Sequence, residues 1–302
     1  MKEKFLNLLH SPAVTAPLLM VFVIGIMSLS RYALYNLGED TNVFMAIGVT
    51  QLAVLGLPCI IYYLIKGRKL ASPVMLVTKR GVNVFFVLFA AMFCVSGMLL
   101  IKYFYFVNGG TVAEVANFYG EFSNADEADK LTVIISLIII PAVCEELFFH
   151  GILLSEYRVY GTANAIIVSA VFFAVLHFSI KNFFVYLFAG LLFGFVTAMT
   201  RSILPAIALH LMNNTLSIFA SDSFLRVIVI KNGAYFIGFV LTLLTAVSFL
   251  LMMSRVESIC YNYAENPPDE ALPAKSRENF FRVFLSPTFL LLAAVFAVLN
   301  LL

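Results

Sequence analysis

The sequence predicts an all-α protein: a polytopic bundle of about eight or nine transmembrane helices that forms a single integral membrane domain over residues 1–302. Of these residues, 62% are hydrophobic and only 12% are charged, so the chain cannot cover a water-facing surface with polar groups. The apolar residues also form long blocks, several of which approach the roughly 20 residues that cross a bilayer. Backbone groups in lipid must be hydrogen-bonded within their own segment, so the blocks should be helical.

Nine apolar segments are candidates for these membrane spans. The segment Lys66–Arg80, after the second of them, contains five basic residues and no acidic residue, and the positive-inside rule therefore places it in the cytoplasm. Alternation from there puts the N-terminus inside and the C-terminus outside, with about two-thirds of the 19 Lys and Arg residues on the inside. The predicted spans are 14–30, 43–65, 83–106, 131–155, 163–179, 182–200, 203–220, 234–254 and 286–302.

Two longer polar connections interrupt the apolar blocks. Residues 107–130 are predicted to form an extracytoplasmic loop, part of which could be an amphipathic helix on the membrane surface. Residues 255–285 are predicted to form a cytoplasmic loop, and three prolines in this segment favour an irregular linker. In the span 182–200, Gly190 and Gly194 have the GxxxG spacing that permits close helix packing.

The overall charge and the cysteines exclude several classes of function. A net charge of +2 is too small to predict nucleic-acid binding. The four cysteines share no CxxC spacing, which gives little support to a structural disulfide or a zinc ribbon. The partner predicted by composition is the lipid bilayer, and we expect a multi-pass protein of the bacterial cell membrane. The sequence does not predict an oligomeric state.

Five titratable residues stand inside apolar spans. Glu145 and Glu146 are the acidic residues placed there, and His150, His177 and His210 are three of the four histidines. A charged side chain at mid-membrane costs about 2.5–3.5 kcal/mol even on the more lenient insertion scales, so such residues indicate function by default. A polar network that only holds helices together is the plainer alternative, but five such groups favour a functional site.

The spacing of these residues limits the chemistry that they can perform. His210 and Asn214 are four residues apart and project from one face of a helix. Glu145 and Glu146 are about 100° apart around a helix, so they should have different roles. A glutamate with a histidine can hold and deprotonate water, while an Asn amide and a second histidine can donate hydrogen bonds to an oxyanion. Together these groups make a complete hydrolytic set.

Three sequence motifs resemble those of a known family. They are EELFFHGIL at Glu145–Leu153, FAVLH at Phe173–His177 and HLMNN at His210–Asn214. In this order, on successive apolar spans, they are similar to the EExxxR, FxxxH and HxxxN motifs of the CAAX-prenyl-protease-like (CPBP) family of intramembrane glutamic endopeptidases, also called Abi proteins. The resemblance covers residues 131–220, which we therefore expect to be the catalytic core.

The resemblance implies the role of each motif residue. Glu145 and His177 would activate water, His210 and Asn214 would form the oxyanion hole, and Glu146 would orient its neighbours. The substrate would be a peptide or a lipidated protein in or at the membrane, and no cofactor is implied.

Two further residues are expected to support this site. Phe173 begins the second motif. His150 occupies the position of the family arginine, which is a departure, because arginine is always charged whereas histidine titrates near neutrality. This departure leaves open a member that has lost catalysis and is retained as a membrane scaffold.

Other functions remain open at this point. Two histidines and a glutamate could hold zinc, as in a His2Glu hydrolase. A transporter could also use intramembrane Glu and His residues, although no internal repeat is visible. With the span boundaries given above, Glu145 and His177 would differ in depth by roughly 10 Å, a mismatch that would break the proposed pair.

Overall fold

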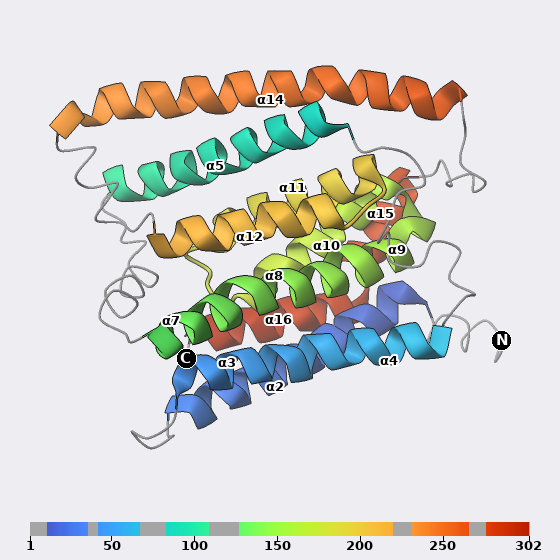
Figure 1. Ribbon diagram of the computed structural model, residues 1–302. Coiled ribbons are helices and arrows are strands. Elements are labelled where there is room, and N and C mark those ends of the chain that lie inside the picture. The colour runs from blue at the N-terminus through green and yellow to red at the C-terminus, as the bar shows by residue number, and fades with distance from the viewer. Residues whose placement is uncertain are drawn as a thin grey trace.

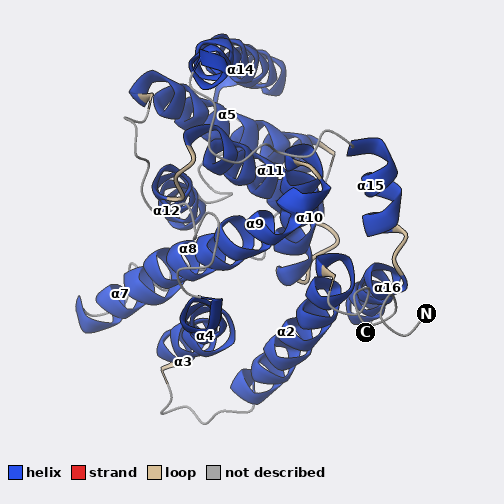
Figure 2. Ribbon diagram, turned by 90° about the vertical axis from the view of Figure 1, so that its right-hand side faces the viewer, coloured by secondary structure: helices blue, strands red, loops and turns tan. Residues whose placement is uncertain are grey.

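A computed structural model describes residues 11–35, 42–66, 83–108, 127–219, 231–265 and 276–301. Within these ranges every regular element is a helix, and the long helices run back and forth between two ends of a bundle (Figures 1 and 2). The predicted all-α, polytopic fold class is confirmed. Six helical segments are long and apolar enough to cross a membrane, and Thr162–Leu176 and Pro287–Leu301 are shorter apolar helices.

Each of the nine predicted spans coincides with a helical segment of the described chain. The first three correspond to α2 (Pro12–Tyr35), to α3 (Val43–Gln51) continued by η1 (Leu52–Gly56) and α4 (Leu57–Lys66), and to α5 (Val84–Val107). The fourth span corresponds to a continuous run of helical segments that the next paragraph describes. The fifth, sixth and seventh correspond to α10 (Thr162–Leu176), α11 (Phe183–Thr200) and α12 (Leu204–Phe219). The last two are α14 (Ala234–Glu265) and α16 (Pro287–Leu301), with the short α15 (Ser276–Phe284) between them.

The fourth span is one continuous helical run that contains two π-helical stretches. It consists of α7 (Glu127–Val133), η3 (Ile134–Ile139), α8 (Ile140–Glu145), η4 (Glu146–Leu153), α9 (Leu154–Tyr157) and η5 (Arg158–Tyr160). The segments η3 and η4 are π-helical, as is η1 in the second span. Pro141 has no N–H group to donate to the preceding turn, which gives a local reason for the π winding that precedes it.

A tight turn at Gly161 sets the relative depth of the first two motifs, which contain Glu145 and His177. Gly161 has a φ of 101°, which favours glycine, and it reverses the chain between η5 and α10. Glu145 and His177 lie the same number of residues before and after this turn, so the antiparallel hairpin brings them to the same level. The expected depth mismatch of roughly 10 Å is therefore wrong. The mismatch was expected because the fourth span was predicted to end at residue 155, whereas the helix continues to Tyr160.

The GxxxG glycines of α11 allow two close approaches. A Cβ atom on Gly190 would lie 2.9 Å from the Cα of Ala170, so only glycine lets α10 and α11 pack at this distance. A Cβ atom on Gly194 would lie 3.1 Å from Cδ2 of His150. The predicted role of these glycines in close helix packing is confirmed.

The long helix α14 lies along α5 at one side of the bundle (Figure 1). The hydroxyl groups of Ser96 and Ser248 lie 3.2 Å apart between the two helices, and Tyr103 donates a hydrogen bond to the carbonyl of Ala234. Because α14 runs on to Glu265 and α15 is helical, the irregular linker predicted within 255–285 is wrong for these parts. The three prolines of that segment, and most of the predicted loop 107–130, lie outside the described residues.

Candidate active site

Glu145 ends α8 in the interior of the bundle, where only 3% of its surface is exposed. Its Oε1 accepts a hydrogen bond of 3.2 Å from Nε2 of Gln51, at the end of α3. Its Oε2 lies 3.9 Å from Nε2 of His177 and receives no hydrogen bond from the described residues. Gln51 was not among the predicted site residues, although an amide inside an apolar span is a signal that could have found it.

His177 follows the last residue of α10 and reaches towards Glu145. Its Nδ1 lies 2.8 Å from the carbonyl oxygen of Phe173, and since a carbonyl can only accept, Nδ1 carries the hydrogen. In the neutral imidazole, Nε2 is then an acceptor. The ring of Tyr186 stacks on the imidazole, with centroids 3.7 Å apart, and fixes its orientation. The atoms Glu145 Oε2 and His177 Nε2 are therefore two acceptors that face each other.

Glu146 points away from Glu145 and is completely buried. Its Oε2 lies 2.7 Å from Nδ1 of His150, and its Oε1 lies 2.8 Å from Nδ1 of His210. The adjacent glutamates thus have different surroundings, as the angle between neighbouring helical positions predicts. Glu146 joins η4 to α12 and fixes the imidazole of His210, because a buried carboxylate must be matched by donors.

His210 and Asn214 project from one face of α12. The His210 ring stacks on Phe193, with centroids 5.1 Å apart, and meets the edge of Phe173. Since Nδ1 of His210 contacts Glu146, its Nε2 can donate a hydrogen bond only when the ring is an imidazolium. One turn further on, Nδ2 of Asn214 lies 3.5 Å from the carbonyl of Ile138, a contact at the limit of a hydrogen bond.

A single cavity of about 240 Å³ connects these groups. It brings together Glu145, His177, His210 and Asn214, the four residues predicted to act directly on a substrate. Apolar and polar side chains share the remaining wall, which is formed by Ile47, Gln51, Met98, Lys102, Leu137, Pro141, Asn182, Val185, Tyr186, Asn213, Ser217 and Ile218. The cavity can thus offer a substrate two acceptors, two potential donors and an apolar surface.

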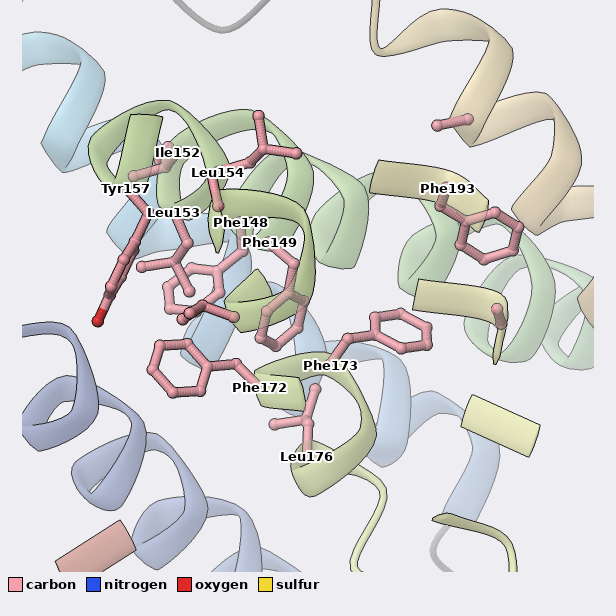
Figure 3. Packing of buried hydrophobic residues seen from close by; sticks show 14 of the residues in the cluster. Phe148, Phe149, Ile152, Leu153, Leu154, Tyr157, Phe172, Phe173, Leu176 and Phe193 are labelled. Carbon is pink, nitrogen blue, oxygen red and sulfur yellow. The ribbon is translucent and has the colours of Figure 1, made fainter. Parts of the chain in front are cut away.

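The remaining predicted residues lie behind this wall. Glu146 and His150 are fully buried and Phe173 is nearly so. The ring of Phe173 lies between two other aromatic rings and is in edge contact with both (Figure 3). These rings belong to Phe149 of η4 and Phe193 of α11. Nε2 of His150 has no hydrogen-bond partner among the described residues. These side chains position the cavity residues and do not themselves line the cavity.

The fold and the cavity together define a class: a polytopic membrane protein with carboxylate and imidazole groups gathered inside its helical bundle. Residues 127–216 match the family described as Type II CAAX prenyl endopeptidase Rce1-like. The matched residues contain all three motifs, and the match supports the resemblance to the CAAX-prenyl-protease-like (CPBP) family on which those motifs were recognised. Comparison with curated proteins and with solved structures gave no match.

Proposed function

We propose that this protein is an intramembrane glutamate-dependent endopeptidase. One observation carries the proposal: Glu145 Oε2 and His177 Nε2 face each other across 3.9 Å, in the cavity that also contains His210 and Asn214. The family match to CAAX-type endopeptidases supports the same reaction.

The geometry suits the activation of one water molecule. Two acceptors at this separation can each take one hydrogen of the same water, which leaves an oxygen lone pair directed towards a substrate carbonyl. As the water oxygen bonds to the carbonyl carbon, Glu145 takes one of its protons as general base. The carboxyl group then gives this proton to the peptide nitrogen when the C–N bond breaks.

The other two cavity residues suit the stabilisation of the oxyanion. His210, held by the carboxylate of Glu146, would donate from Nε2 as an imidazolium, and Asn214 would donate from its amide. Prepositioned donors of this kind act where negative charge develops, and the loss of one typically costs about 100- to 1,000-fold in rate.

The proposed substrate is a peptide at the membrane, with a prenylated cysteine peptide as the first to test, because the matched family is named for that activity. The apolar part of the cavity wall, formed by Ile47, Met98, Leu137 and Ile218, can contact a lipidated or apolar segment.

The direct test is cleavage of matched peptides, with and without a prenyl group, by the purified protein in detergent. We expect new termini by mass spectrometry, equal rates with and without a metal chelator, and loss of turnover in Glu145→Gln. This variant keeps the size of the side chain and removes the base. Near-normal turnover in Glu145→Gln would overturn the glutamate-base mechanism, and inhibition by the chelator would favour a zinc hydrolase.

A further inference from the structure

The carboxylate of Glu145 performs the proposed chemistry with one of its two oxygens, Oε2, which lies 3.9 Å from Nε2 of His177. A carboxylate can turn about its Cγ–Cδ bond, so its oxygens exchange places unless a neighbouring group distinguishes them. Among the described residues this neighbour is Gln51, whose Nε2 lies 3.2 Å from Oε1. Oε2 has no hydrogen-bond partner within the same part of the chain. The amide therefore distinguishes the two oxygens.

Gln51 is unusual in its own helix. The candidate span Val43–Leu64 has a mean hydropathy of 2.1, and Gln51 is its only residue with an amide or a charged group. An amide inside a membrane costs free energy unless it is hydrogen-bonded. Gln51 lines the same cavity as Glu145, so its donor lies at the wall where the reaction is proposed. It stands outside residues 127–216, and the family match therefore assigns it no role.

Glycines on both sides of Gln51 let the second span approach the fourth span closely. A Cβ atom on Gly48 would lie 2.6 Å from Oγ of Ser136, and one on Gly56 would lie 3.3 Å from Sγ of Cys144. The helix α3 accordingly packs against α8 and the preceding η3 (Figure 2). The packing of these two spans thus brings the amide within reach of the carboxylate.

The winding of both helices changes directly after the two partners. Gln51 is the last residue of α3, and the π-helical η1 begins at Leu52. Glu145 is the last residue of α8, and the π-helical η4 begins at Glu146. Short π-helical stretches inside α-helices are frequent at functional sites. That two of them begin at the two ends of one hydrogen bond favours a functional role for this bond over a purely structural one.

The orientation of the amide points the same way. An ionised carboxylate only accepts hydrogen bonds, so the N–H group of Gln51 faces Glu145. The amide oxygen of Gln51 is then buried without a hydrogen-bond partner among the described residues. An unmatched buried acceptor costs free energy, so an amide that served only to join two helices would be poorly placed here.

From this geometry we propose that Gln51 is a positioning residue: by donating to Oε1, it holds the carboxylate of Glu145 with Oε2 directed at His177. The hydrogen bond is compatible with the whole proposed proton transfer. When Oε2 takes a proton from water, Oε1 becomes the carbonyl oxygen of the acid and still accepts from the amide. When the proton passes to the peptide nitrogen, the carboxylate is restored. The effect on turnover rests on the proposed peptidase function, whereas the hydrogen bond does not.

A double-mutant cycle of thermal unfolding in detergent tests the hydrogen bond without turnover. Gln51→Met and Glu145→Met each remove one partner and keep a side chain of similar length. We expect Gln51→Met to lower the unfolding midpoint by about 2–4 °C, because a buried carboxylate is left without its donor. In the Glu145→Met background, where no carboxylate remains, the same change should cost little. Equal losses in both backgrounds would exclude the hydrogen bond and the proposal with it.

Steady-state kinetics on the peptide that the wild type cleaves test the positioning role. We expect Gln51→Met to lower kcat by about 10- to 100-fold and to leave KM within about twofold, because a misdirected base slows the chemical step and not binding. Thr50→Val is the matched control, since Thr50 precedes Gln51 in α3 and does not line the cavity. It should keep the kcat of the wild type.

Two kinetic outcomes would contradict the positioning role. A rise in KM at constant kcat would make Gln51 a substrate contact, and an equal loss of kcat in Gln51→Met and Thr50→Val would reduce its role to helix packing. The two proposals also fail separately. A wild type that cleaves no peptide but shows coupling in the unfolding cycle would lose the peptidase function and keep the hydrogen bond. Full turnover in Gln51→Met would keep the peptidase function and remove the positioning role.

Discussion

At the scale of single residues, the polar groups of the site divide into two sets. Glu145 and His177 line the cavity, and their opposed acceptor atoms, Oε2 and Nε2, lie 3.9 Å apart. Glu146 is buried behind the wall and is bonded to His150 and His210. A buried carboxylate is tolerated when donors match it, so the second set can fix the position of His210 without meeting the substrate itself.

His150 shows how a departure from the family motif is accommodated. Its ring is fully buried beside Gly194, close to where a Cβ atom would lie, and its Nδ1 contacts Glu146. His150 thus provides a hydrogen-bond partner for Glu146, as an arginine here could, but it needs less space than an arginine.

Asn214→Ala tests the proposed oxyanion donor. We expect kcat to fall by about 100- to 1,000-fold with little change in KM, because the amide would act mainly on the charge that develops in the transition state. Steady-state kinetics on the peptide that the wild type cleaves would measure this. A fall of less than tenfold in a folded variant would remove Asn214 from the oxyanion hole.

At the scale of elements, the sequence predicts where helices lie better than where they end. The fourth span was predicted to end at residue 155, yet the helix continues to Tyr160 and includes the charged residues Glu156 and Arg158. Tyr62 of α4 hydrogen-bonds the carboxylate of Glu156, so this polar residue has a partner within the bundle. Hydropathy cannot reveal such a tertiary partner, and it contains no signal for the π-helical winding of η3 and η4.

Gly190→Ala tests the close packing of α10 and α11. We expect destabilisation of about 1–3 kcal/mol, because the new methyl group would meet the backbone of Ala170 at 2.9 Å. Gly25→Ala in α2 is the matched control: nothing lies within 4 Å of its Cβ position, and alanine favours a helix by up to about 1 kcal/mol. Thermal unfolding in detergent, followed by circular dichroism, compares the two. Equal stability of both variants would contradict the packing role of Gly190.

At the scale of the whole molecule, the sequence predicts which motifs meet but not what else surrounds them. Glu145, His177 and His210 could be predicted as site residues because each is a titratable residue inside an apolar span. The cavity brings these three residues together. The contact between Gln51 and Glu145 joins residues 94 positions apart, and a single amide gives no indication of its partner. Side-chain contacts between distant helices follow from packing, which periodicity does not encode.

The last helix of the chain illustrates such a contact. The hydroxyl groups of Ser286 and Thr288 both donate to the carbonyl of Ala13 and thereby join the start of α16 to α2. At the other end of α16, Oδ1 of Asn300 accepts a hydrogen bond of 2.9 Å from the backbone N–H of Ile180. Ile180 belongs to the short connection between α10 and α11, which also contains His177 and Asn182 of the cavity wall. A helix outside the motif region thus contacts the segment that contains His177, the residue proposed to activate water with Glu145.

Asn300→Leu should therefore affect a site to which α16 contributes no residue. Without its acceptor, the N–H of Ile180 loses a bond worth about 0.5–1.5 kcal/mol, and the segment that positions His177 becomes less constrained. We expect turnover to fall by roughly 2- to 10-fold. Asn300→Asp retains an acceptor oxygen and should stay close to wild type. The measurement is kcat for the three proteins under one set of detergent conditions. If the leucine and aspartate variants lose activity equally, the effect does not pass through this hydrogen bond; if neither loses activity, the segment is positioned without α16.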